Sequence, residues 1–183
     1  MSALSRRAVA SSLLAVLAAT DVSAQHVRRA APDRRLSELG LSLPEPPRPV
    51  ASYVAFRRVG RLMHLAGLGP ANVTGQPPLF GRVGSELSVE QGYAAARAAG
   101  LNVLALLRSA CGGTLNRVVQ CVHVGVFVAS ADDFHEQPRV ANGASDLFAE
   151  VFGDAGLGAR FAVGANTLPF NIPVEVASIW EVR

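Results

Sequence analysis

Cysteine is scarce in this sequence, since Cys111 and Cys121 are its only two in 183 residues. Two cysteines cannot form a disulfide framework, and their spacing does not match the CxxC pairs of a zinc site. We therefore expect no bound metal. Cys121 lies in an apolar stretch and is expected to be an inert filler. A reactive Cys111 at a helix end, or a single disulfide between the two residues, stays open.

Charge is also scarce: Asp, Glu, Lys and Arg make up 17% of the residues, whereas hydrophobic residues make up 50%. This balance argues against disorder and allows one globular domain with a core. The formal net charge is +3, and much of the positive charge lies ahead of the expected domain. The arginines concerned are Arg6, Arg7, Arg28, Arg29, Arg34 and Arg35. A net charge distributed in this way gives no reason to expect a nucleic-acid partner.

The N-terminal apolar run, Ala8–Thr20, has thirteen residues. That is too short for a helix across a bilayer, which takes about 20 residues. Arginines precede the run and Val22-Ser23-Ala24 follows it, which is the three-part pattern of a secretory signal with cleavage before Gln25. We expect residues 1–24 to be a signal peptide that exports the protein to the periplasm, without a membrane anchor. A misassigned start codon, which would leave the protein in the cytoplasm, and an organelle transit peptide are the alternatives.

Residues 25–36 are polar and Arg-rich and are expected to form a flexible lead-in. The rest of the chain, residues 37–183, carries the pattern of one domain. Val-, Ile- and aromatic-rich segments bounded by Gly, Asn and Pro predict strands. These strands are expected at 51–56, 62–66, near 81–83, 118–128, 158–165 and 172–180.

Two segments of this domain predict helices. A capping box at Ser88 and Gln91 precedes an Ala- and Leu-rich helix that ends before Gly112-Gly113. A second helix is expected from Asp132-Asp133 to a stop at Gly153. The resulting order, β-β-(β)-α-β-α-β-β, indicates an α+β fold with one sheet and two helices on one face.

The other face of such a sheet needs cover. The apolar strand residues exceed what two helices can bury, and a subunit interface in a closed ring is the usual solution. The residues that indicate this surplus are Tyr53, Val118, Val122, Val124, Val126 and Trp180.

Two charged residues, Arg160 and Glu175, interrupt the apolar C-terminal strands. A buried guanidinium without a partner is costly, so Arg160 must be paired or must face a cavity. Its partner could be a ligand anion, Glu175 or a group on a neighbouring subunit. Glu175 could equally serve chemistry or only neutralise Arg160.

The sequence also resembles a known family in several motifs. They are Ser37-Glu38-Leu39-Gly40-Leu41-Ser42-Leu43-Pro44, Pro49-Val50-Ala51-Ser52-Tyr53-Val54, Leu65-Ala66-Gly67, Asn142-Gly143-Ala144-Ser145-Asp146-Leu147, and Ala159-Arg160 through Leu168-Pro169 to Val174-Glu175. Together they resemble the Rid/YjgF family, the reactive-intermediate deaminases also labelled L-PSP endoribonuclease-like. The resemblance spans Leu36 to Arg183 and implies a chorismate-mutase-like fold and a homotrimer with three clefts between subunits.

The resemblance implies a role for each matching residue. Arg160 would clamp a substrate carboxylate, Glu175 would position the hydrolytic water, and Tyr53 would line the same cleft. Ser145, or Asn142 under a shifted alignment, would supply a polar group from a helix. A guanidinium suits this task because it meets a carboxylate in a planar two-point geometry that lysine cannot copy.

The sequence departs from the family pattern beside the cleft. Ala66 and Leu68 flank Gly67, where deaminating members usually carry Ser and Gln, and Phe161 follows Arg160 where a small residue is usual. These changes remove polar contacts and imply a divergent subgroup with altered or absent activity.

The expected function is hydrolysis of a carboxylate-bearing imine or enamine of the 2-iminopropanoate type, without metal or cofactor. The expected partners are a small carboxylate ligand and further copies of the chain. A non-catalytic trimer that binds small carboxylates is the alternative, and an endoribonuclease ranks last. His64 and His123 are expected in the core or an interface, and His135 in solvent.

Overall fold

The computed structural model describes residues 31–72 and 77–183. The signal peptide expected at residues 1–24 lies outside these ranges and stays a prediction. Within the described ranges, no helix combines the length and the hydropathy needed to cross a bilayer.

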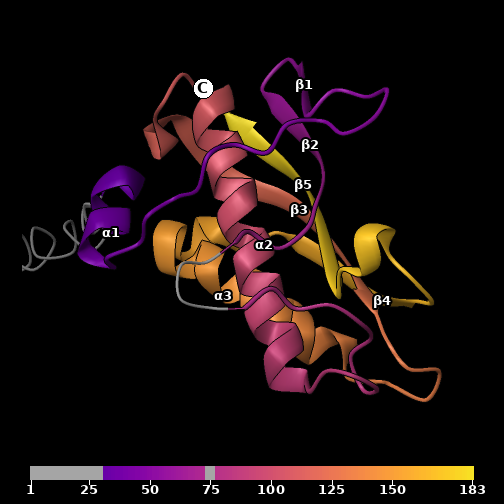
Figure 1. Ribbon diagram of the computed structural model, residues 1–183. Helices are drawn as coiled ribbons and strands as arrows, with labels where there is room; N and C mark the ends of the chain where they lie inside the picture. The colour runs from indigo at the N-terminus through magenta and orange to yellow at the C-terminus, as the bar shows by residue number, and fades with distance from the viewer. Residues whose placement is uncertain (1–30, 73–76) are drawn as a thin grey trace, which may run out of the picture. The chain divides into compact units, whose positions relative to one another are not determined.

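The described chain forms a single five-stranded sheet with helices packed on it (Figure 1). The helices are α1 (Pro32–Glu38), α2 (Val89–Ala110) and α3 (Gln137–Phe152). The strands are β1 (Phe56–Val59), β2 (Leu62–Leu68), β3 (Val118–Ala129), β4 (Ala159–Ala165) and β5 (Val174–Val182). Short 3-10 turns occupy Leu115–Arg117, Gly153–Gly156 and Pro169–Asn171. The predicted α+β class, with one sheet, is confirmed.

The sheet order is β1-β2-β5-β3-β4. β4 runs parallel to β3, and the other neighbouring pairs are antiparallel. A parallel pair needs a crossover, and α3 provides it between β3 and β4. In this order the last strand of the sequence, β5, lies between β2 and β3. The strand that precedes it in the sequence, β4, forms one edge of the sheet.

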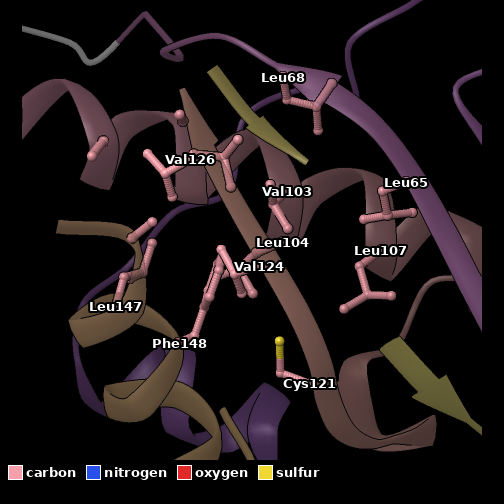
Figure 2. Packing of buried hydrophobic residues seen from close by; sticks show 14 of the residues in the cluster. Leu65, Leu68, Val103, Leu104, Leu107, Cys121, Val124, Val126, Leu147 and Phe148 are labelled. Carbon is pink, nitrogen blue, oxygen red and sulfur yellow. The ribbon is translucent and has the colours of Figure 1, made fainter. Parts of the chain in front are cut away.

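Helices α2 and α3 lie side by side on one face of the sheet (Figure 1). The core fills the space between this face and the helices, and Figure 2 shows Leu104, Val124 and Phe148 meeting there. Trp180 of β5 is fully buried, with its ring 5.1 Å from that of Phe148 and 5.2 Å from that of Phe152. Its indole N–H donates to Ser178 Oγ at 2.9 Å, so the burial leaves no polar atom unpaired.

The predicted capping box is present at the start of α2. The Ser88 hydroxyl accepts a hydrogen bond from the Gln91 backbone N–H at 3.2 Å, and the Gln91 side chain accepts one from Ser88 N–H at 2.9 Å. The helix ends as expected, because Gly112 and Gly113 have φ of 77° and 90°, which favours glycine.

The two long helices approach each other most closely at Gly143. A Cβ on this residue would lie 2.0 Å from the Tyr93 carbonyl oxygen. Beside this contact the Tyr93 hydroxyl donates to Asp146 Oδ2 at 2.9 Å, and Arg97 donates to both oxygens of Glu150. Burial and the Asp146 carboxylate raise the pKa of Tyr93, so the phenol stays a donor. These contacts fix α3 against α2.

The structure corrects the start of the domain. A helix, α1, occupies Pro32–Glu38, where a flexible lead-in was expected up to residue 36. Proline suits the first turn of a helix, and the Asp33 carboxylate accepts hydrogen bonds from the Thr114 hydroxyl and from Leu115 N–H at 3.1 Å. Leu36 is buried in the core, so tertiary contacts order this short helix.

Two strand predictions were also inaccurate. Residues 51–55 contain no strand, and β1 begins only at Phe56, so Tyr53 lies in the segment before the sheet. The short strand expected near residues 81–83 is reduced to isolated bridges from Val83 to Leu87 and Ser130.

The apolar residues predicted to need a subunit interface are mostly core residues. Val118, Val124, Val126 and Trp180 face the helices and are buried. The opposite face of the sheet is nevertheless apolar, since Leu62, Phe161 and Val163 are partly exposed there. Within a single chain β3 is therefore fully covered only on the face toward the helices, and cover of the other face by a subunit interface stays a prediction.

Both cysteines are free and buried. Burial raises the pKa of the Cys111 thiol, and raises that of Cys121 to about 12. At pH 8 a thiol with that pKa is roughly one part in ten thousand thiolate. We expect the native protein not to react with 5,5′-dithiobis(2-nitrobenzoic acid) within minutes, and both thiols to react at once in urea. Rapid release of one equivalent from the native protein would contradict this.

Candidate functional site

A groove of about 750 Å³ lies at one end of β2 and β5. Its walls come from the proline-rich segment 47–51 with Tyr53, from Ala66 to Leu68 of β2 with the following Gly69, and from Pro169, Phe170 and Ile172 before β5. Glu175 also lines it. The structure therefore brings together four of the predicted site residues, which are Tyr53, Ala66, Gly67 and Glu175.

Glu175 owes its position to a glycine on the neighbouring strand. A Cβ on Gly67 would lie 1.9 Å from Glu175 Oε1, so the carboxylate occupies the space that a side chain would fill. The ladder between β2 and β5 is irregular between Leu65 and Leu68, which is where Gly67 lies. The carboxylate thus lies over the β2 backbone and borders the groove.

We expect Gly67→Ala to impair the site more than the fold. The new methyl group would displace the Glu175 carboxylate, which is the far end of a flexible side chain and can move cheaply. A misplacement of about 1 Å can cost on the order of 100-fold in rate. Ligand turnover or affinity should fall by roughly that factor while the urea midpoint changes little. Unchanged function in Gly67→Ala would show that the Glu175 position is unimportant.

Arg160 lies near the start of β4 and reaches α3. Its Nη1 donates to Asn142 Oδ1 and to Ser145 Oγ, each at 2.9 Å, and its Nη2 lies 3.4 Å from the Pro138 carbonyl oxygen. All three acceptors are uncharged, and no ion pair within residues 31–72 and 77–183 involves Arg160. The side chain is exposed. Its charge is therefore oriented by α3 but not neutralised.

Asn142 and Ser145 lie three residues apart, on one face of α3. The sequence left open which of them reaches the cleft, and both contact the same guanidinium nitrogen. They hold Arg160 in place, with the helix itself fixed by the Gly143 contact with α2.

Arg160 and Glu175 lie on opposite faces of the sheet. Arg160 pairs with buried Val124 and contacts α3, whereas Glu175 alternates with buried Val174 and Val176 and so points away from the helices. β3 separates their strands and they are offset by three positions, which places their Cα atoms roughly 14 Å apart. Within one chain they cannot act on the same small ligand.

Phe161 does not share a face with Arg160. Its ring centroid lies 5.5 Å from that of His123 and 5.4 Å from that of Phe127, on the face away from the helices. The ring covers Gly125, where a Cβ would lie 2.5 Å from Phe161 Cζ. His123 therefore makes a tilted aromatic contact with Phe161 on this face, and an interface position for it stays a prediction.

The groove residues that sequence reasoning missed include Arg48, Phe170 and Ile172. Phe170 and Asn171 have positive φ, 58° and 57°, which is unusual for residues other than glycine. Adjacent prolines and asparagines in the sequence indicate a turn, but not which side chain it presents.

Comparison with known proteins agrees with this architecture. The family model described as YjgF/chorismate mutase-like, putative endoribonuclease, matches residues 33–180. Protein TCP17 of Trypanosoma cruzi is 43% identical over 149 residues, which is 81% of this chain and 92% of that protein.

Two solved structures are similar throughout the domain. Protein Atu1372 of Agrobacterium tumefaciens, described as of unknown function, is 38% identical with a TM-score of 0.75, covering 84% of this chain and 94% of its own. A putative endoribonuclease of Shewanella oneidensis is 33% identical with a TM-score of 0.78, and the match covers 83% of this chain and 99% of that protein. The resemblance seen in the sequence motifs is thus confirmed over nearly the whole domain, and the chain belongs to the YjgF/chorismate mutase-like family.

Proposed function

We propose that the protein hydrolyses reactive imines that carry a carboxylate, releasing an oxo acid and ammonium. The observation that carries the proposal is the Arg160 guanidinium, which is exposed, held by Asn142 and Ser145, and unpaired with any carboxylate of the described chain. A planar guanidinium in this state is suited to bind a carboxylate by two parallel hydrogen bonds.

The proposed site forms between copies of the chain. Because Arg160 and Glu175 face opposite sides of the sheet, a ligand can meet both only where one copy presents β4 and α3 to the groove of another. The partly exposed apolar side chains on the face away from the helices suit such contact. A closed ring of three copies is the assembly we propose.

The chemistry needs one anion clamp and one base. Arg160 holds the carboxylate of the protonated imine, and Glu175 takes a proton from water as the water oxygen bonds to the imine carbon. The carbon–nitrogen double bond becomes a single bond. Glu175 then returns the proton to nitrogen, and the carbon–nitrogen bond breaks as the carbonyl forms. The hydroxyl proton passes to the departing ammonia, which leaves as ammonium, and Glu175 is again a carboxylate. The balance is protonated imine plus water to oxo acid plus ammonium.

A second candidate is a trimer that binds small carboxylates without chemistry. Ala66 and buried Leu68 favour it, because the wall beside Glu175 offers no side-chain hydroxyl or amide at these two positions. An endoribonuclease, the activity named for some relatives, ranks below both. Among the described residues that line the groove, Arg48 is the one cation, which is little for a polyanion.

The test compares the native protein with Glu175→Gln. An amino-acid oxidase with catalase generates the imine in situ, and its decay is followed while calorimetry measures oxo-acid binding. We expect native protein to accelerate decay and Glu175→Gln to lose at least about 100-fold of that acceleration while it still binds oxo acids. Binding without acceleration by the native protein would favour the non-catalytic alternative. If the native protein neither binds oxo acids nor accelerates imine decay, both candidate functions are refuted.

A further inference from the structure

The groove is far more apolar than a three-carbon ligand requires. Its walls are mainly prolines, alanines, Val50, Leu68, Tyr53 and Phe170, with Glu175 and Arg48 as the charged groups. Its volume is about 750 Å³, and a second, apolar cavity of about 150 Å³ adjoins it, since Pro70 and Ile172 line both.

We propose that this site selects ligands whose carboxylate-bearing carbon carries a branched aliphatic or aromatic substituent, with Phe170 and Ile172 as the specificity-determining residues. The inference rests on the proposed function for the position of the carboxylate. It adds the class of substituent that the groove accepts.

Phe170 is presented to the groove by an unusual backbone. It is 74% exposed, and both it and Asn171 have positive φ. Hydrogen bonds hold the turn: Gly81 N–H donates to the Asn171 carbonyl at 2.9 Å, and Ile172 N–H donates to that of Pro169 at 3.3 Å. A strained turn that places a large apolar ring in solvent at a groove indicates a partner for that ring.

Ile172 separates the two cavities. Its Cδ1 occupies the space beside Gly69, where a Cβ would lie 2.7 Å away. Behind it, Ala94, Ala95 and Ala98 of α2 line the second cavity together with Leu79 and Phe80. An apolar cavity of about this size can hold a benzene ring. Ile172 therefore limits how far a substituent can extend.

The apolar walls predict the ranking of ligands. Each methylene that becomes buried tightens binding by about fourfold. Relative to the alanine-derived imine, the leucine-derived imine should react at least about tenfold faster in kcat/KM. Pyruvate should bind correspondingly more weakly than 4-methyl-2-oxopentanoate.

The experiment measures both series for the native protein and three variants. An amino-acid oxidase with catalase generates the imines of alanine, leucine and phenylalanine, and calorimetry gives Kd for the three matching oxo acids. Phe170→Gly keeps the positive φ and removes the ring, so the leucine-to-alanine ratio should fall about fivefold or more. Ile172→Ala should join the cavities and raise the phenylalanine-to-leucine ratio. Leu157→Ala truncates an apolar residue that is also exposed, at 56%, and lies outside the groove, so it should leave both ratios unchanged.

The outcomes separate the two proposals. Oxo acids that rank as expected, without imine hydrolysis, would remove the proposed activity and leave the selectivity standing. The selectivity alone would be overturned if hydrolysis were fastest with the alanine-derived imine. It would also be overturned if Phe170→Gly left the leucine-to-alanine ratio unchanged. Light scattering of Phe170→Gly adds a check: loss of assembly with unchanged ratios would show that the ring packs against another copy. If the native protein neither binds the oxo acids nor hydrolyses the imines, both proposals are overturned.

Discussion

Replacing Arg160 with glutamine should weaken binding of oxo acids by about 30- to 150-fold, which corresponds to about 2–3 kcal/mol. Glutamine can still accept or donate a hydrogen bond toward Asn142, but it carries no charge and cannot form two parallel bonds to a carboxylate. Arg160→Lys should recover only part of the loss, because an ammonium lacks the planar fork. Calorimetry with the three proteins measures the effect.

Arg139→Gln is the matched control for this prediction. Arg139 is also an exposed arginine associated with α3, and it pairs with Glu136 and Glu90. Its removal should not change ligand binding, and neither substitution should change the free energy of unfolding by more than about 1 kcal/mol, since both residues are exposed. Equal weakening in the two variants would mean that overall positive charge, and not Arg160 itself, attracts the ligand.

Gly143→Ala should destabilise the protein by at least about 2 kcal/mol. The added methyl would lie 2.0 Å from the Tyr93 carbonyl oxygen and 2.9 Å from the Arg97 backbone nitrogen. Both are backbone atoms of α2, so the helices must move apart. Because Asn142 and Ser145 flank this position on α3, ligand affinity should fall as well. Urea unfolding and calorimetry on the same samples measure the two effects.

Gly100→Ala is the comparison for the helix contact. It places the same methyl in α2, but the nearest atom is Leu147 Cδ2, 2.9 Å away at the end of a flexible side chain. The gain in helix propensity, about 1 kcal/mol, should offset much of that crowding. If Gly143→Ala were as stable as Gly100→Ala, the close approach of the helix backbones would not constrain α3.

Sequence alone predicted those parts of the fold that local chemistry specifies. The capping box of Ser88 and Gln91, and the glycines that end α2, act within a few residues and gave the helix its limits. The long apolar stretch at 118–128 became β3 for the same reason. The strand prediction for residues 51–56 was inaccurate, because the composition of this segment suits a strand but pairing with β2 begins only at Phe56. Helix α1 was missed because contacts with Thr114 and Leu115, distant in sequence, order it.

By itself the sequence determined the α+β class, the family and the candidate site residues Arg160 and Glu175. Hydrophobic periodicity, helix caps and family motifs each depend on residues that are close together in the sequence. The tertiary structure alone decided that β5 lies between β2 and β3, and therefore that Arg160 and Glu175 point to opposite faces. It also decided that Gly67 gives the Glu175 carboxylate its place and that Phe170 and Ile172 border the groove. Strand order and backbone turns depend on contacts between segments that are distant in the sequence. The energies of these contacts cannot be predicted from a local sequence pattern.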